Sequence, residues 1–187
     1  MGQLQQKPMT ATEFLVWEEK QELKWEFDGS QPVAMTGGTD AHAAIQGNLL
    51  TALNNRLRGK HRYARNSEVK IEIGSKYRYP DAFVSCTRVA PSATIAAEPV
   101  VIFEVLSEST AKTDRTTKLM EYRSLPSLQR YVLLEQDQVV ATVITRVDTG
   151  WSIEVLDAAG TLSMPEIDVE ITMAELYEGL ELTPLEL

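Results

Sequence analysis

"VVIFEVLSES", residues 100–109, is the most hydrophobic strand-like stretch of the chain, and it carries Glu104 in its middle. A run of this length suits a buried central strand and is too short to span a bilayer. Burying an ionised carboxylate costs several kcal/mol unless the group is paired or bound to a metal. Glu104 is therefore expected either to have a special role or to pair with a buried Arg or Lys.

A second stretch, "RYPDAFVSC" at residues 78–86, places Asp81 directly after a proline and before an apolar run. On neighbouring strands Asp81 and Glu104 could share a divalent cation, whereas without one their like charges would raise a pKa or strain the fold. Mg²⁺ prefers oxygen ligands and commonly takes only one or two protein carboxylates. The alternative for Asp81 is an exposed strand end without a special role.

The N-terminal part of the chain predicts a short helix followed by a hairpin. Thr10 or Thr12 can cap the helix, which is expected to run to about Glu22. The dipeptide at residues 28–29, Asp-Gly, favours a tight turn, with Glu26 on the first strand of the hairpin.

The middle of the chain predicts a long helix and then strands. Asp40 is expected to cap the helix and Gly59 to end it. The apolar face of this helix consists of Ile45, Leu49, Ala52, Leu53 and Leu57. The period then changes to two, with Val69, Ile71 and Ile73 alternating against Glu68, Lys70 and Glu72. This strand is expected to pair antiparallel with the strand at 77–86, while "SATIAAEP" at residues 92–99 is read as a connection.

The rest of the chain predicts a helix, a strand and a second hairpin. The helix "TAKTDRTTKLMEYRSL" ends before Pro126, and "QRYVLLE" is expected to be a buried strand. The runs "VVATVITR" and "WSIEVLD" flank a turn at "VDTG", and "TMAELYEG" predicts a short helix near the C-terminus.

Two further side chains are candidates for chemistry. Lys118 lies on the helix that follows Glu104, and Asp114 precedes it by four residues, so the two could form a solvent-facing ion pair. If the helix packs back over the strand, the ammonium instead enters the carboxylate pair and could stabilise negative charge at phosphorus. His42 shares a helix face with Gln46 and by itself has no assigned role.

The amino-acid composition is that of an ordinary globular protein, and the chain is expected to form one domain over residues 1–187. It has 43% hydrophobic and 24% charged residues, with a net charge of −9 that counts against indiscriminate nucleic-acid or membrane binding. The lone Cys86 cannot form an internal disulfide. The start of the chain lacks an uninterrupted apolar run, so a cytoplasmic location and no membrane partner are expected.

These segments together resemble a known family. "KWEFDGSQPVAMTGGTDAHAAIQGNLLTAL", "YRYPDAFVSC", "EPVVIFEVLSESTAKTDRTTKLMEYRSLPSLQRYVLLEQ" and "ITMAELYEG" are similar to the Uma-two family of restriction endonucleases, within the PD-(D/E)XK nuclease superfamily. The resemblance runs from about Met9 to Gly179. It implies an α/β fold with a restriction-endonuclease-like αβββαβ core, a mixed sheet flanked by helices. An added N-terminal helix and hairpin and a C-terminal hairpin complete the expected fold.

The resemblance also implies a site. The aspartate of the family's proline-aspartate pair and the glutamate of the next strand match Asp81 and Glu104, which would bind the catalytic metal. The usual superfamily lysine would fall at position 106, where this chain has Leu106, so its role is assigned to Lys118. The family's hairpin glutamate and helix-start histidine match Glu26 and His42.

The function that follows is hydrolysis of DNA phosphodiester bonds with Mg²⁺ or Mn²⁺ as cofactor. The oligomeric state stays open, and a homodimer is one option because cutting both strands of a duplex often uses two symmetry-related sites. Two alternatives stay open: a protein that binds or assembles through a nuclease fold without cleaving, and a hydrolase for a smaller phosphoester.

Overall fold

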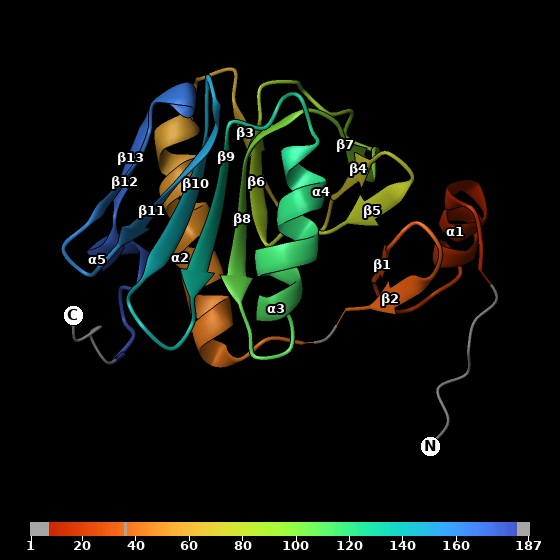
Figure 1. The fold of residues 1–187 in the computed structure, drawn as a ribbon, viewed down its shortest axis with the longest axis horizontal. Helices are drawn as coiled ribbons and strands as arrows, with labels where there is room; N and C mark the ends of the chain where they lie inside the picture. Colours follow the sequence, from red (N-terminus) through yellow and green to blue (C-terminus); the bar gives the residue numbers. More distant parts are fainter. Residues whose placement is uncertain (1–7, 36, 183–187) are drawn as a thin grey trace.

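The computed structural model describes residues 8–35 and 37–182 and is built around a six-stranded mixed sheet (Figure 1). In spatial order, its strands are β11 (Gly150–Leu156), β10 (Ala141–Val147), β9 (Arg130–Glu135), β8 (Pro99–Leu106), β6 (Ala82–Ser85) and β3 (Tyr63–Asn66). The expected central strand is β8, which pairs antiparallel with β6 and parallel with β9.

The two faces of β8 are covered by different helices. Val101, Phe103 and Val105 belong to the cluster that packs on the long helix α2, while Ile102 and Leu106 pack in a second cluster with residues such as Tyr122. Because side chains alternate along a strand, Glu104 lies on the same face as Ile102 and Leu106. This face is the one covered by the helical segment that carries Lys118.

Helix α2 (Asp40–Leu57) forms as its apolar spacing predicts, and all five residues of the expected face are buried. Its N-cap is Thr39, not Asp40 as expected, because the Thr39 hydroxyl accepts a hydrogen bond from the His42 N–H while Asp40 is the first helical residue. Beyond Arg58 the chain turns at Gly59, which has a φ of +79°.

A second, five-stranded sheet packs beside the first. Its strands, in spatial order, are β2 (Pro32–Ala34), β1 (Trp25–Phe27), β5 (Lys76–Arg78), β4 (Lys70–Ile73) and β7 (Ile95–Ala96). The expected antiparallel pair is therefore divided between the two sheets, because β3 pairs with β6 and β4 pairs with β5. The segment read as a connection contains β7, which runs parallel to β4.

The prediction that Lys70 lies on a polar face of β4 (Lys70–Ile73) is wrong. Lys70 is buried, and its ammonium pairs with Glu18 at the end of the N-terminal helix. Glu18 also accepts a hydrogen bond from the Tyr79 hydroxyl at 2.6 Å. A single strand cannot reveal this contact, because it depends on a partner 52 residues earlier in the chain.

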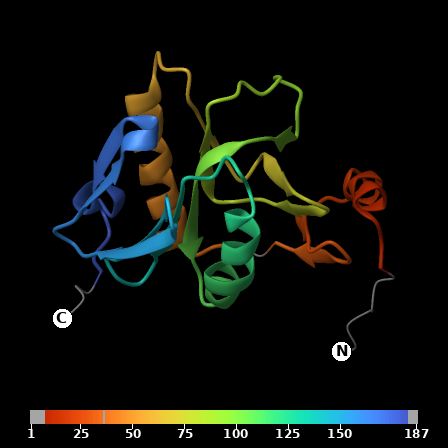
Figure 2. The ribbon, with the colours of Figure 1, turned by 45° about the horizontal axis from the view of Figure 1, so that its top comes forward.

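The N-terminal helix α1 (Ala11–Glu18) docks the first hairpin onto the second sheet, at one side of the molecule (Figures 1 and 2). Thr10 is the N-cap and forms a capping box with Glu13. The helix ends four residues earlier than about Glu22, at Glu18. Phe14 is fully buried and stacks on Phe27 with ring centroids 4.8 Å apart. This packing holds β1, and with it Glu26, beside β5.

The helix expected after β8 consists of three segments. These are α3 (Ala111–Thr113), a π-helical turn η1 (Asp114–Lys118) and α4 (Leu119–Arg123). A π-helical turn widens the helix and is frequently found at functional sites. The sequence reading predicted one regular helix and missed this turn, which carries both Asp114 and Lys118.

The C-terminal part contains the expected hairpin β10–β11 and the short helix α5 (Met173–Leu176). Between them lies a hairpin that was not predicted, β12 (Thr161–Met164) and β13 (Val169–Thr172), joined by the 3₁₀ turn η2 (Pro165–Ile167). Among residues 8–35 and 37–182, no helix has the length and hydropathy required to cross a bilayer. The expected α/β fold with mixed sheets and flanking helices is confirmed.

Candidate active site

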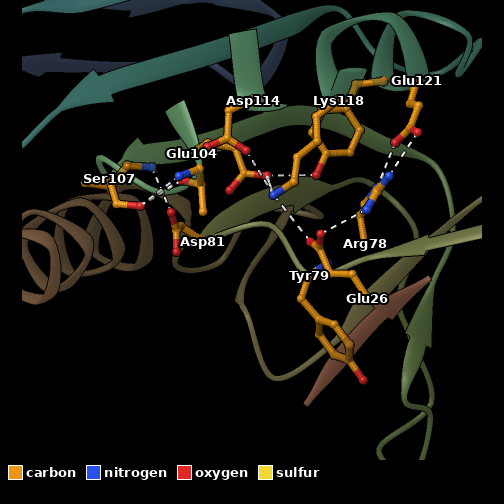
Figure 3. A network of polar contacts seen from close by, with 12 residues as sticks. Glu26, Arg78, Tyr79, Asp81, Glu104, Ser107, Asp114, Lys118 and Glu121 are labelled. Carbon is orange, nitrogen blue, oxygen red and sulfur yellow. Dashed lines mark hydrogen bonds and ion pairs between the residues drawn. The ribbon is translucent and has the colours of Figure 1, made fainter. Parts of the chain in front are cut away.

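Glu104 and Lys118 form the centre of a buried ionic cluster (Figure 3). Lys118 Nζ donates to Glu104 Oε1 at 3.0 Å, and the Tyr122 hydroxyl donates to the same oxygen at 2.8 Å. Glu104 is 3% exposed and Lys118 is 6% exposed. The helix therefore packs back over the strand, and the alternative of a solvent-facing lysine is wrong.

The Lys118 ammonium also contacts two further carboxylates. Nζ lies 3.3 Å from Glu26 Oε1 and 3.1 Å from Asp114 Oδ1. The contact with Asp114 is an ion pair without hydrogen-bond geometry, so this buried Oδ1 atom accepts no hydrogen bond from the described part of the chain. The predicted pairing of Asp114 with Lys118 exists, but it is buried and shared with Glu26 and Glu104.

Asp81 immediately precedes β6, next to Glu104 across the strand pair. Ala82 pairs with Phe103, so one further step of this register sets Asp81 opposite Glu104. Asp81 Oδ2 accepts the Val105 N–H at 2.7 Å and lies 3.2 Å from His42 Nε2. Gln46 donates to the Asp81 carbonyl at 2.9 Å and lies 3.4 Å from Oδ1. Helix α2 thus orients Asp81 through two side chains one turn apart.

The ionic cluster continues away from Asp81 along an alternating series of charges. Glu26 Oε2 accepts from Arg78 Nη1 at 3.0 Å, and Glu26 Oε1 accepts the Tyr79 N–H at 3.2 Å. Arg78 then binds Glu121 through two hydrogen bonds of 2.7 and 2.9 Å. Sequence reasoning missed Arg78 and Glu121. The only available signal was a cation between two tyrosines just before the proline-aspartate pair.

The charge balance of the cluster shifts several pKa values. Burial by itself lowers the pKa of Lys118, but Glu104, Glu26 and Asp114 outweigh it, so the pKa lies well above its usual range. Burial raises the pKa of Glu104, and Asp114 adds to this, while Lys118 opposes it. One ammonium is shared by three carboxylates. The raised pKa of Lys118 and the raised pKa of Glu104 are therefore consistent with each other. Lys118 is therefore protonated at neutral pH.

The pKa of His42 is also raised, by its neighbour Asp81. Its hydrogen bond to Asp81 raises the pKa of the imidazole, although partial burial opposes the shift. A protonated His42 donates to Asp81 and holds that carboxylate in place. The family resemblance implied that His42 belongs to the site, but not that it contacts Asp81.

A cavity of about 430 Å³ opens beside these residues. Asp81, Glu104, Lys118, Glu26 and His42 all line it, which brings the five predicted site residues together. One wall is rich in hydroxyl groups, from Ser107, Ser109, Thr110, Thr113 and Thr117. Leu106, at the position of the usual superfamily lysine, is instead 2% exposed within an apolar cluster.

The oxygens available at this cavity suit a hard divalent cation. The hydrogen bonds from Lys118 and Tyr122 both go to Glu104 Oε1, and the donors to the Asp81 side chain within 3.2 Å both face Oδ2. Glu104 Oε2 is thus left for another partner, and Asp81 Oδ1 has only the long contact of 3.4 Å with Gln46 within the described ranges. No group of three or more His, Cys, Asp or Glu side chains in the described ranges is arranged to hold a metal. Mg²⁺ needs only one or two protein carboxylates, so the donor set fits it.

Comparisons with known proteins agree with this architecture. The Uma2 (Uma-two) family model, described as "Putative restriction endonuclease", matches residues 11–174. The uncharacterised protein slr1290 of Synechocystis sp. is 34% identical over 176 residues, covering 92% of this chain and 93% of that protein. A second uncharacterised Synechocystis protein, sll1609, is 30% identical over 135 residues, covering 70% of this chain and 76% of its own length.

A solved structure supports the same fold. The crystal structure of a "putative nuclease belonging to DUF820" from Anabaena variabilis superposes with a TM-score of 0.77 and 19% sequence identity. The match covers 91% of this chain and 98% of that chain. With the family model matching most of the chain, this protein belongs to the Uma2 family of restriction-endonuclease-like proteins.

Proposed function

We propose that this protein is a divalent-metal-dependent endonuclease that hydrolyses DNA phosphodiester bonds. The observation that carries the proposal is the convergence of Asp81, Glu104 and Lys118 on one cavity, from a strand start, a central strand and a π-helical turn. Lys118 approaches Glu104 to 3.0 Å, so the helix supplies a lysine that position 106 lacks. Family membership supports the same class of reaction.

Asp81 and Glu104 would hold the metal, Mg²⁺ or Mn²⁺. When bound, such an ion lowers the pKa of water and neutralises charge on a phosphoryl group. The chain's own residues would do the rest. Lys118, as an ammonium ion, donates hydrogen bonds to a phosphoryl oxygen and stabilises the negative charge that develops there. It does not accept the proton of the attacking water, because it is already protonated.

Glu26 and His42 act on these three residues. Glu26 lies between Lys118 and Arg78, so it restrains the ammonium at the edge of the cavity. His42 contacts Asp81 Oδ2, the oxygen that also accepts the Val105 N–H, so Oδ1, whose contact with Gln46 is a long 3.4 Å, would be the oxygen that binds the metal. Both residues are positioning residues in this proposal.

The decisive experiment measures nicking of supercoiled plasmid with Mg²⁺ or Mn²⁺, for the wild type, Glu104→Gln and Lys118→Ala. We expect nicking by the wild type and none by either variant. Calorimetric titration with Mn²⁺ should show weaker binding by Glu104→Gln, whereas Lys118→Ala should bind at least as well as the wild type, since the lysine is not a ligand. Equal Mn²⁺ binding by the wild type and Glu104→Gln would refute the metal assignment. Linear product at a rate that rises with the square of protein concentration would support a homodimer.

The second candidate is a nuclease-fold protein that binds without cleaving. It is favoured by the saturation of Lys118 with three carboxylates and by the apolar side chain at position 106. Absence of nicking under every divalent metal would select it. Hydrolysis of a chromogenic phosphodiester with intact plasmid would instead select a hydrolase for smaller substrates.

A further inference from the structure

A second cavity lies at the opposite end of α2 from the candidate active site. It has a volume of about 440 Å³ and is lined by residues between Asn54 and Arg65. Arg58, Lys60, Arg62 and Arg65 contribute four cationic side chains to its wall. None of the residues assigned to hydrolysis lines this cavity.

The sequence around this cavity is unusual for so acidic a chain. Residues 56–65, "RLRGKHRYAR", hold five of the 18 Lys and Arg residues. No Asp or Glu occurs from Ala41 to Ser67, although the chain has 27 acidic residues. The local charge therefore opposes the net charge of −9.

Some of these cations are neutralised by acids from the C-terminal part. Lys60 pairs with Asp168 at 2.6 Å, and Arg56 pairs with Glu175. The nearby Glu166 carboxylate is taken by Arg130 at 2.6 Å. These pairs use Glu166 of η2, Asp168 directly after it and Glu175 of α5, and they do not include the remaining arginines.

Within the described ranges, three arginines of the cavity form no ion pair with a carboxylate: Arg58, Arg62 and Arg65. The charge of Arg62 acts on Asp168 only at longer range. Arg58 is exposed and follows the last residue of α2. Arg65 donates to the Ala64 carbonyl and lies over the Tyr63 ring at 5.6 Å. Arg62 has a weak contact to the Glu166 carbonyl at 3.4 Å, and its Nε–H is buried without an acceptor in the described part of the chain.

A buried donor without an acceptor is destabilising, so Arg62 has hydrogen-bonding capacity that the described protein groups do not satisfy and that an anion in the cavity would use. The C-terminus of α2 opposes an anion with only about half an elementary negative charge. Three unpaired guanidinium groups outweigh that partial charge. Guanidinium groups favour phosphate because they donate two parallel hydrogen bonds to it.

We propose that this basic cavity binds a backbone phosphate of duplex DNA, as a second contact remote from the reacting bond. The proposal rests on the proposed nuclease function for the identity of the ligand. The 16 residues of helix between positions 42 and 58 span about 24 Å at 1.5 Å per residue. At 3.4 Å per base pair, a duplex lying parallel to α2 would have the contacted phosphate about seven base pairs from the site of hydrolysis.

The test measures binding of a fluorescein-labelled 24-base-pair duplex by fluorescence anisotropy, in EDTA and over a series of salt concentrations. The cavity variant is Arg58→Gln with Arg62→Gln. The matched control is Lys20→Gln with Arg88→Gln, which removes two exposed positive charges elsewhere. Loss of this phosphate contact should lower the slope of log affinity against log salt by about 0.9 and weaken binding at every salt concentration. The control should keep the wild-type slope.

Two further measurements keep the test decisive. Arg58→Glu alters only an exposed side chain, so it should weaken duplex binding even if the double variant is unstable. Inorganic phosphate at matched ionic strength serves as the small-anion probe, read by melting temperature. Stabilisation by phosphate that depends on Arg58 and Arg62, with unchanged duplex binding, would make this a small-anion site and overturn the proposal. Wild-type affinity and slope in both cavity variants would also overturn it.

The outcome separates this inference from the proposed activity. Cavity-dependent duplex binding without plasmid nicking would leave the DNA contact standing and refute the endonuclease. Nicking by the wild type together with normal duplex binding by the cavity variants would refute the contact alone.

Discussion

Replacement of Lys118 by methionine tests the ionic cluster most directly. The ammonium is the cation nearest to Glu104 and Asp114, at 3.0 and 3.1 Å, whereas Glu26 retains Arg78. Methionine keeps most of the volume of the side chain and removes its charge. Lys118→Met therefore leaves two carboxylates buried without their cation, and it should destabilise the fold strongly.

The expected magnitude follows from two separate estimates. Removing one partner of a buried ion pair costs about 3–5 kcal/mol. Alternatively, one carboxyl takes up a proton, and from its ordinary pKa of 4.5 this costs about 3.4 kcal/mol at pH 7, at 1.36 kcal/mol per pH unit. In a chain of 187 residues, a loss of about 3–5 kcal/mol lowers the melting temperature by about 6–20 °C.

The assay is thermal unfolding in EDTA, followed by circular dichroism, at pH 7 and at pH 5. Without Lys118 the pKa of Glu104, which burial already raises, rises further, so the folded variant binds more protons than its unfolded chain. The difference in melting temperature between Lys118→Met and the wild type should therefore become smaller as the pH falls. Glu104→Gln should cost about 1 kcal/mol or less, because the amide oxygen can still accept from Lys118 and Tyr122.

Lys112→Met is the matched control, because Lys112 is exposed on the same helical segment, and it should melt as the wild type does. The reasoning is refuted if Lys118→Met melts within about 2 °C of the wild type, or if Glu104→Gln is as destabilising as Lys118→Met.

Two further predictions concern other parts of the fold. Partial burial raises the pKa of Glu121, but the hydrogen bonds from Arg78 outweigh it and lower the pKa. The pair therefore stabilises the protein fully at pH values above the ordinary carboxyl pKa of 4.5. This contribution is lost as the pH falls through the lower pKa of the folded state. Urea unfolding of Glu121→Gln should show its largest deficit near pH 7 and a smaller one below pH 4; a deficit independent of pH would contradict the ion pair. Thr10→Ala should cost about 1 kcal/mol in urea unfolding because it removes the α1 cap, whereas Thr12→Ala should cost less, and equal losses would speak against the capping box.

Local patterns predicted the elements well where one face of an element is buried. The apolar face of α2 and the apolar run at β8 predict that these elements are buried, because a helix or strand with such a pattern must cover its apolar side chains. The patterns failed where a long-range contact decides the outcome. Lys70 was expected on a polar face, but its partner Glu18 comes from α1. Thr39 and Asp40 are both good caps, and only the backbone geometry distinguishes them.

The sequence by itself identified the unusual carboxylates, since Glu104 within an apolar strand and Asp81 after Pro80 are visible without coordinates. It also located Lys118, but it could not distinguish a solvent-facing lysine from one that enters the site. Tertiary structure decided that question, because β8 exposes Glu104 on the face covered by the π-helical turn. The distances of 3.0–3.3 Å around the ammonium arise only when segments from β1, β8 and the helix pack together. The interaction energy of two charges depends on the distance between them, and for residues far apart in the sequence only the fold sets that distance.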